Sequence, residues 1–263
     1  MKVVLFCGGL GTRIREYSES VPKPMVPVGN QPILMHVMQY YSAYGHRDFV
    51  LCTGYKSNVI KDYFLKVRPE DYSDVVISGN GRKVETIGDA PPDWTISLID
   101  TGTWRNIGQR LYAVKKYVED EEFFLANYSD GLTDAPLPEM IEKFKASGKL
   151  ACFLAVRPPF TFHLVEFGDD GNVERLRANT EADIWVNAGY FIFRRGFFDY
   201  MKEGDELVLD PFNRLIADNK LMAYRYNGFW RAMDTLKYRQ DLEAMVEKGD
   251  MPWRVNADGT RKK

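Results

Sequence analysis

Strand-like and helix-like segments alternate along the first 150 residues, and this alternation limits the fold more than any other feature of the chain. Short apolar runs at 2–7, 49–53 and 123–128 have the composition of buried strands, whereas Ile33–Tyr44 and Pro138–Ala146 repeat apolar residues at the helical period. Such alternation favours a parallel sheet that is covered by helices on both faces. We therefore predict an α/β fold with a Rossmann-like, mostly parallel sheet.

The pattern changes after about residue 149. Short extended runs on either side of Asp170-Gly171-Asn172 predict a β-hairpin, and a longer strand-like run follows over 183–193. The sheet should therefore be mixed, with an antiparallel insertion in the second half of the chain. We expect one domain over residues 1–263, made of a half of about 1–148, a half of about 149–235, and a C-terminal helix and tail of about 236–263.

The charge balance argues against two classes of partner. The chain has 35 Lys and Arg against 37 Asp and Glu, a formal net charge of −2, so it lacks the basic surface that general nucleic-acid or membrane binding requires. No apolar run approaches the roughly 18 residues that cross a bilayer, and the first apolar run stops at Gly8, too early for a signal peptide. We expect a cytoplasmic protein that binds neither nucleic acid nor membrane.

Metal chemistry in this chain should use oxygen ligands. The three cysteines lack the CxxC spacing of a zinc site, and the three histidines are scattered along the sequence. A hard cation such as Mg²⁺, which carboxylates and phosphate oxygens bind, is the metal that the remaining residues favour.

A glycine-rich segment, Gly8-Gly9-Leu10-Gly11-Thr12-Arg13, follows the first predicted strand directly. Glycines at this point let the backbone approach a ligand, and their N–H groups can bind phosphate. The segment is neither a Walker A loop, since Gly-Lys-Ser/Thr is absent, nor a dinucleotide fingerprint, since Ile14 stands where the third glycine belongs. The alternative is a glycine-rich turn that binds nothing.

Three charged residues complete a candidate site. Lys23 lies between Pro22 and Pro24, which fix the backbone and make the ammonium a well-placed charge for a polyphosphate. Asp130 follows the predicted strand 123–128, and Asp234 directly precedes the last predicted helix. Two carboxylates from distant segments can share one Mg²⁺. Taken singly, Lys23 also fits an ordinary surface lysine, and each aspartate fits a turn or cap residue.

Together these motifs resemble the signature of the sugar-phosphate nucleotidyltransferases. Gly8-Gly9-Leu10-Gly11-Thr12-Arg13 followed by Pro22-Lys23-Pro24-Met25 is specific to that family, and the similarity continues in order along nearly the whole chain. Ile99-Asp100-Thr101-Gly102 and Gly108-Gln109-Arg110-Leu111 point to the glucose-1-phosphate cytidylyltransferase branch. The resemblance implies a magnesium-dependent displacement in which an acceptor phosphate oxygen attacks the α-phosphorus of CTP and pyrophosphate leaves.

The resemblance also implies a role for individual residues. Arg13 and Lys23 would be catalytic, and Asp130 with Asp234 would hold Mg²⁺. The first half of the chain would bind the nucleotide, through Gly8, Gly9, Gly11, Thr12, Arg13, Gly108 and Arg110. The second half would provide most of the site for a phosphorylated acceptor. Its pocket would be drawn from Tyr128, at the end of a strand in the first half, and from His163, Glu166, Arg175, Arg177, Asn187 and Trp230. The family tends to assemble, so a homo-oligomer is expected.

The acceptor half departs from the family pattern. Relatives carry Glu-Lys-Pro after the antiparallel hairpin, whereas this chain reads Leu176-Arg177-Ala178-Asn179-Thr180 and lacks the lysine. Relatives have glycine at the position of His163, and Gly-Asp-Gly in place of Ser129-Asp130-Gly131. Because an acceptor phosphate beside a triphosphate needs a cation, Arg177 or Arg175 is expected to replace the lysine.

Three other functions remain open at this point. The acceptor is either a sugar 1-phosphate, such as glucose 1-phosphate, or a phosphorylated metabolite of different shape. The nucleotide is CTP if the cytidylyl branch is correct, with a uridylyl or thymidylyl enzyme as the alternative. The alternative outside the enzymes is a protein that senses a nucleotide without catalysing a reaction. The presence of both Asp130 and Asp234 argues against this alternative.

Overall fold

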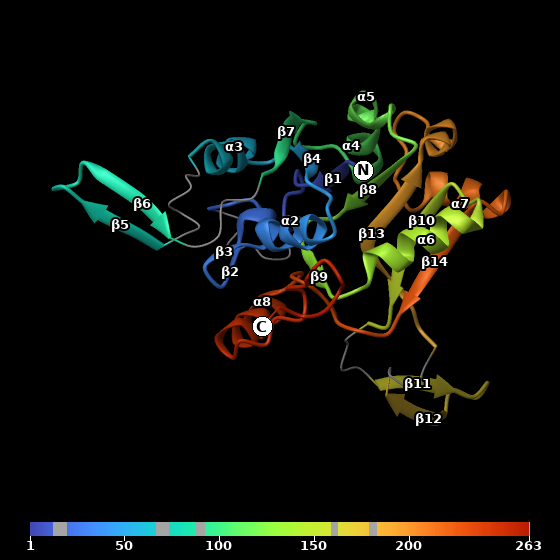
Figure 1. Cartoon of the computed structure of the whole chain (residues 1–263). Coiled ribbons are helices and arrows are strands. Elements are labelled where there is room, and N and C mark those ends of the chain that lie inside the picture. The colour runs from blue at the N-terminus through green and yellow to red at the C-terminus, as the bar shows by residue number, and fades with distance from the viewer. Residues whose placement is uncertain (13–19, 67–73, 88–92, 159–162, 179–182, 263) are drawn as a thin grey trace.

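A seven-stranded sheet forms the centre of the protein (Figure 1). The computed structural model describes residues 1–12, 20–66, 74–87, 93–158, 163–178 and 183–262. The strand order is β14-β10-β13-β8-β1-β4-β7. Strand β13 runs antiparallel to both of its neighbours, and the other neighbouring pairs are parallel. The strands are β1 (Val3–Phe6), β4 (Asp48–Thr53), β7 (Thr95–Asp100), β8 (Phe123–Asn127), β10 (Ala151–Val156), β13 (Val186–Arg194) and β14 (Leu221–Tyr226). The predicted mixed, mostly parallel α/β sheet is confirmed.

Helices cover both faces of the sheet, as the alternating pattern predicts. Successive side chains of β1 point to opposite faces, so Val3 and Leu5 join one buried cluster while Val4 and Phe6 join the other. The first cluster includes residues of α2 (Ile33–Ala43), α3 (Ser57–Lys66), α6 (Leu137–Ser147) and α8 (Leu236–Glu247). The second includes residues of α4 (Ile107–Ala113), α5 (Lys115–Val118), α7 (Asp210–Ala217) and the 3₁₀ helix η5 (Arg195–Tyr200).

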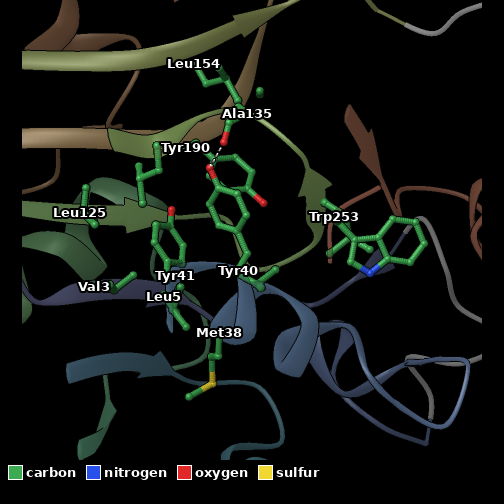
Figure 2. Close-up of a cluster of buried hydrophobic side chains, with 14 of the residues drawn as sticks. Val3, Leu5, Met38, Tyr40, Tyr41, Leu125, Ala135, Leu154, Tyr190 and Trp253 are labelled. Atoms are coloured by element: carbon green, nitrogen blue, oxygen red, sulfur yellow. Dashed lines mark hydrogen bonds between the residues drawn. The ribbon is translucent and has the colours of Figure 1, made fainter. Parts of the chain in front are cut away.

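Tyrosines fill the centre of the first cluster (Figure 2). Tyr40 and Tyr41 of α2 pack against Tyr190 of β13, with ring centroids 5.5 and 5.9 Å from it. The Tyr40 hydroxyl donates to the Ala135 carbonyl at 2.7 Å, so its buried polar atom is satisfied. This cluster holds α2 against the central strands and fixes the segment that precedes it.

Two hairpins project from the body of the molecule (Figure 1). One hairpin consists of β11 (His163–Phe167) and β12 (Val173–Ala178), which follow β10 and precede β13 along the chain. It confirms the predicted antiparallel insertion. The other joins β5 (Asp74–Ser78) to β6 (Lys83–Ile87), and the sequence reasoning missed it. Its turn, with Gly79, Asn80 and Gly81 all at positive φ, carries a hairpin signal that was present in the sequence.

The second face of the sheet is covered by short helical segments. Helices α4 and α5 meet at Val114, and η5 is a 3₁₀ helix. Within the described part of the chain, no helix combines the length and the apolar character that crossing a bilayer requires.

Candidate active site

The glycine segment begins where β1 ends, at the carboxyl edge of the sheet. Cys7 N–H still donates to the Cys52 carbonyl of β4 at 2.9 Å, and Gly8 directly follows. A methyl group at Gly8 would lie 2.0 Å from Nη1 of Arg110, so only glycine fits there. Gly9 faces open space, since a methyl group there would meet no atom within 4 Å, and Gly11 has φ +63°. Packing against Arg110 therefore requires glycine at position 8, whereas Gly9 is open and accessible to a ligand.

A cavity of ≈ 310 Å³ opens beside this segment. Its lining residues come from four parts of the chain that meet at the carboxyl ends of β1 and β8, the position where α/β sheets bind ligands. They are Phe6, Gly9, Gly11, Thr12, Lys23, Pro24, Ile107, Tyr128 and Asp130. The structure thus brings the glycine segment, the lysine and one of the predicted metal ligands to one cavity.

Lys23 binds both predicted metal ligands. Its Nζ lies 2.5 Å from Oδ2 of Asp130 and 2.7 Å from Oδ1 of Asp234, and its side chain is 12% exposed. Burial lowers the pKa of Lys23, but the two carboxylates outweigh burial and leave that pKa above its usual value. The side chain therefore stays charged, and the two carboxylates face one point.

Two short strands bring these carboxylates together. Asp130 precedes β9 (Gly131–Thr133), and Asp234 follows closely after β15 (Trp230–Ala232). The strands pair antiparallel with Ala232 opposite Gly131, and Met233 N–H donates to the Asp130 carbonyl at 2.8 Å. The backbone alone therefore places the aspartates side by side, although 104 positions separate them in the sequence (234 minus 130).

Ser129 holds the backbone before Asp130 in a conformation that glycine usually adopts. Its φ is +63°, and its side chain is fully buried. The Ser129 hydroxyl donates to the Phe6 carbonyl at 2.8 Å, and its N–H donates to Oδ1 of Asn127 at 2.6 Å. These bonds stabilise the turn directly before Asp130 and so help to hold that carboxylate in place.

Arg110 lies behind the glycine segment rather than in the cavity. Its side chain is 1% exposed, and its two terminal nitrogens donate to the carbonyls of Gly8, Thr53, Gly102 and Thr103 and to the Thr101 hydroxyl. Burial lowers the pKa of this guanidinium. Arg110 thus joins the carboxyl ends of β1, β4 and β7, and it is not among the residues that line the cavity. Gly108 is also buried, against the Asp205 carbonyl, and does not line the cavity.

Three of the predicted acceptor residues lie near the metal-ligand pair. Tyr128 lines the cavity and packs on Gly189, where a methyl group would lie 2.5 Å from its ring. Asn187 donates to the Tyr128 hydroxyl at 3.5 Å, and burial raises the pKa of that phenol. Trp230 of β15 donates from Nε1 to the Ala188 carbonyl at 3.0 Å. Of these three side chains, Tyr128 lines the cavity, and Asn187 and Trp230 lie outside its lining.

The other four predicted acceptor residues lie on the β11–β12 hairpin, which projects from the sheet (Figure 1). Glu166 forms an ion pair with Arg177, and Arg175 stands opposite Glu166 in the register. His163 is exposed at the start of β11. None of these side chains lines the cavity, so this structure does not bring His163, Glu166, Arg175 or Arg177 together with Lys23.

A comparison with known protein families shows to which family the chain belongs. A family profile described as Nucleotidyl transferase matches residues 2–237. The chain belongs to the nucleotidyl transferase family. This confirms the resemblance drawn from the glycine segment and the lysine, and the protein is a nucleotidyltransferase enzyme.

Individual relatives show to which kinds of nucleotidyltransferase this chain is similar. It is 37% identical over 257 residues to the glucose-1-phosphate cytidylyltransferase of Salmonella typhi, an alignment that covers 97% of this chain and 99% of that protein. Identity and coverage are the same for the protein of that name from Salmonella typhimurium. The solved structure of HddC from Yersinia pseudotuberculosis matches with a TM-score of 0.64 and 18% identity, over 93% of this chain and 99% of that one, and supports the fold.

The two carboxylates fit the Mg²⁺ that this family typically uses. Both offer oxygen atoms to one point, which is the donor chemistry that Mg²⁺ requires. Among the described residues no group of three His, Cys, Asp or Glu side chains is placed to hold a metal, so substrate phosphates and water would complete the coordination.

The sequence reasoning missed part of the cavity wall. Phe6 and Ile107 line the cavity without having been singled out, and they carry no signal beyond their apolar character. Pro24, which also lines the cavity, was predicted only to fix the backbone at Lys23. Arg13, predicted to be catalytic, lies outside the described residues.

Proposed function

We propose that this nucleotidyltransferase is a cytidylyltransferase that joins CTP and a sugar 1-phosphate to give a CDP-sugar and pyrophosphate. One observation carries the proposal: a charged lysine and two convergent carboxylates lie at the edge of a cavity that a glycine segment lines. A cation, two metal ligands and a glycine segment that lets phosphate approach the backbone are what phosphoryl transfer needs, since it is catalysed mainly by positioning and charge neutralisation.

The proposed reaction is a single in-line displacement. An oxygen of the acceptor phosphate forms a bond to the α-phosphorus of CTP, the bond from that phosphorus to the β-phosphate oxygen breaks, and pyrophosphate leaves with the electron pair. Mg²⁺, when bound by Asp130 and Asp234, would neutralise phosphate charge and orient the triphosphate. Lys23 would stabilise the charge that develops around the α-phosphorus. No covalent intermediate with the protein is required.

The residues divide between the two substrates. Gly9, Gly11 and Thr12 would contact the triphosphate, with Arg13 beside them, and Arg110 would hold Gly8 in place behind them. In this division residues of about 1–148 bind the nucleotide, and residues of about 149–235 provide most of the acceptor site. On the acceptor side, Tyr128, Asn187 and Trp230 would form the wall next to the metal.

The acceptor phosphate still needs a positive partner. Arg177 is the candidate for the position of the family lysine, but it is paired with Glu166 on the hairpin. We propose that, when the acceptor contacts the hairpin, its phosphate competes with Glu166 for the Arg177 guanidinium. A sugar 1-phosphate is the acceptor class that the relatives' printed names favour.

We further propose that the enzyme is a homo-oligomer. One face of the β11–β12 hairpin carries Val165, Phe167, Val173 and Leu176, all exposed. Exposed apolar side chains on a two-stranded hairpin are typical of a surface that another protein surface covers. A second copy of this chain is the occupant that we expect.

A substrate screen tests the proposed function. Each of the four nucleoside triphosphates is incubated with Mg²⁺ and a panel of phosphorylated acceptors, and pyrophosphate release is measured. We expect release with CTP and a sugar 1-phosphate. Preference for UTP or dTTP would replace the cytidylyl assignment, and release with a different phosphorylated metabolite would replace the acceptor.

A further inference from the structure

The ammonium of Lys23 occupies the point on which the two metal-binding carboxylates converge. It contacts Asp130 at 2.5 Å and Asp234 at 2.7 Å, distances of strong charge-assisted hydrogen bonds. The carboxylates are held at this point by β9 and β15 and not only by the lysine. A cation site therefore exists in the free protein, and a side chain of the protein itself fills it.

The backbone that carries Lys23 is fixed. Lys23–Met25 form a 3₁₀ turn, in which Met25 N–H donates to the Pro22 carbonyl at 2.8 Å and Val26 N–H donates to the Lys23 carbonyl at 3.1 Å. Pro24 and Met25 are buried. Any change in the position of the ammonium must come from rotation of the side chain.

The cavity gives that side chain another place to go. Lys23 lines the cavity together with Asp130 and with Gly9 and Gly11 of the glycine segment. The proposed triphosphate would bring several negative charges into this space. Without it, an ammonium that left the carboxylates would have no described anionic partner among the residues that line the cavity.

We infer that Lys23 is an internal counter-ion that excludes a divalent cation from Asp130 and Asp234 until the triphosphate arrives. The inference rests on the proposed function. A metal ion alone must displace an ammonium that both carboxylates bind, and must then remain beside that displaced positive charge. A metal ion that arrives with the triphosphate supplies the ammonium with a new anion. Metal and nucleotide therefore bind together, and the metal alone binds weakly.

The test measures Mn²⁺ binding to the folded protein without nucleotide, from the electron paramagnetic resonance signal of free Mn²⁺. We expect Lys23→Met to bind Mn²⁺ at least tenfold more tightly than the natural protein. Lys23→Arg, which keeps the charge, should bind Mn²⁺ as weakly as the natural protein. Lys149→Met is the matched control, because among the described residues the Lys149 ammonium bonds only Asn219, beside the edge strand β14, and its loss changes the net charge equally. Lys23→Gln replaces Lys23→Met if that variant fails to fold.

A second variant locates the new affinity. Adding Asp234→Asn to Lys23→Met should remove the gain. Equal Mn²⁺ affinity in the natural protein and in folded Lys23→Met would overturn the inference, as would an equal gain in Lys149→Met. Failure of the proposed function gives a different result: Mn²⁺ binding in the presence of CTP would then be unchanged by Asp130→Asn and Asp234→Asn.

Discussion

At the scale of single residues, the site depends on charges held at fixed points. Asp130 and Asp234 share one ammonium, and Ser129 keeps the turn before Asp130 in the left-handed conformation. The places of Asp130 and Asp234 follow from the backbone pairing of β9 with β15, so either carboxylate can be replaced by an amide without breaking that pairing. This separation allows chemistry and folding to be tested independently.

Replacing either carboxylate by its amide tests the metal ligands. Asp130→Asn and Asp234→Asn keep the size of the side chain but remove one of the two negative charges that would bind Mg²⁺. We expect kcat to fall by at least tenfold in each variant, about 1.4 kcal/mol of activation free energy. Steady-state rates at saturating Mg²⁺ measure this. Losses below tenfold in both variants would remove the pair from the mechanism.

Two neighbouring glycines provide a matched comparison. A methyl group at Gly8 would meet Nη1 of Arg110 at 2.0 Å, and that guanidinium cannot yield without losing its bonds to backbone carbonyls. We expect Gly8→Ala to lower the free energy of unfolding by about 1–3 kcal/mol. Gly9→Ala, which meets no atom within 4 Å, should unfold like the natural protein but bind CTP more weakly. Urea unfolding and calorimetric titration measure the two effects. Equal stability of both variants would contradict the role given to Arg110.

At the scale of elements, the long strands could be predicted from the sequence but the two short strands that build the site could not. Strands such as β1 and β8 are apolar runs bounded by turn residues, which local pattern identifies. Strands β9 and β15 have three residues each, too few to show a period, and they pair only because the chain returns after about a hundred residues. Asp130 and Asp234 were predicted from their places after the strand 123–128 and before the last helix, with support from the family resemblance, and not from these short strands.

A buried histidine on α2 links the segment before that helix to the C-terminal segment of the chain. His36 of α2 bonds the Val28 carbonyl through Nε2 at 2.9 Å, and its Nδ1 accepts from Nε1 of Trp253 at 3.1 Å. Burial lowers the pKa of His36 to about 4, because the ring would have to carry its charge away from water and its Nδ1 is already an acceptor.

This histidine predicts a loss of stability in acid. Its pKa is about 4 in the folded protein against 6.5 for an ordinary histidine, so the unfolded chain binds the proton more readily between these values. The free energy of unfolding should therefore fall as the pH drops from 6.5 towards 4, with His36 contributing about 2 kcal/mol of that loss by pH 5. Urea unfolding at pH 7 and pH 5 compares the natural protein with His36→Gln. The variant should lose less stability over this interval, and an equal loss would show that His36 does not contribute.

At the scale of the whole molecule, the sequence predicted the class of fold but not how its parts lie relative to one another. The alternating pattern implied the parallel sheet, and the hairpin signal at 170–172 implied the insertion. A local sequence pattern contains no information on which strands become neighbours. The position of β13 between β8 and β10 could therefore not be predicted. For the same reason the distance of Arg175 and Arg177 from Lys23 could not be predicted.

The projecting hairpin gives a prediction for assembly. Phe167 and Leu176 are each 63% exposed on its apolar face. We expect the natural protein to be an oligomer in size-exclusion chromatography with light scattering. Leu176→Glu should shift it towards smaller species, whereas Asp169→Lys, an exposed change in the turn of the same hairpin, should not. A natural protein that is monomeric at all concentrations would contradict the assembly.

The most direct test of the central claim measures product formation and its dependence on the two aspartates together. The natural protein is incubated with CTP, glucose 1-phosphate and Mg²⁺, and CDP-glucose and pyrophosphate are quantified by chromatography over time. The account predicts that both products appear in equal amounts, require Mg²⁺, and fall at least tenfold in Asp130→Asn and in Asp234→Asn. Absence of a nucleotidyl product with every combination of the four nucleoside triphosphates and the acceptor panel, or full turnover in both variants, would contradict it.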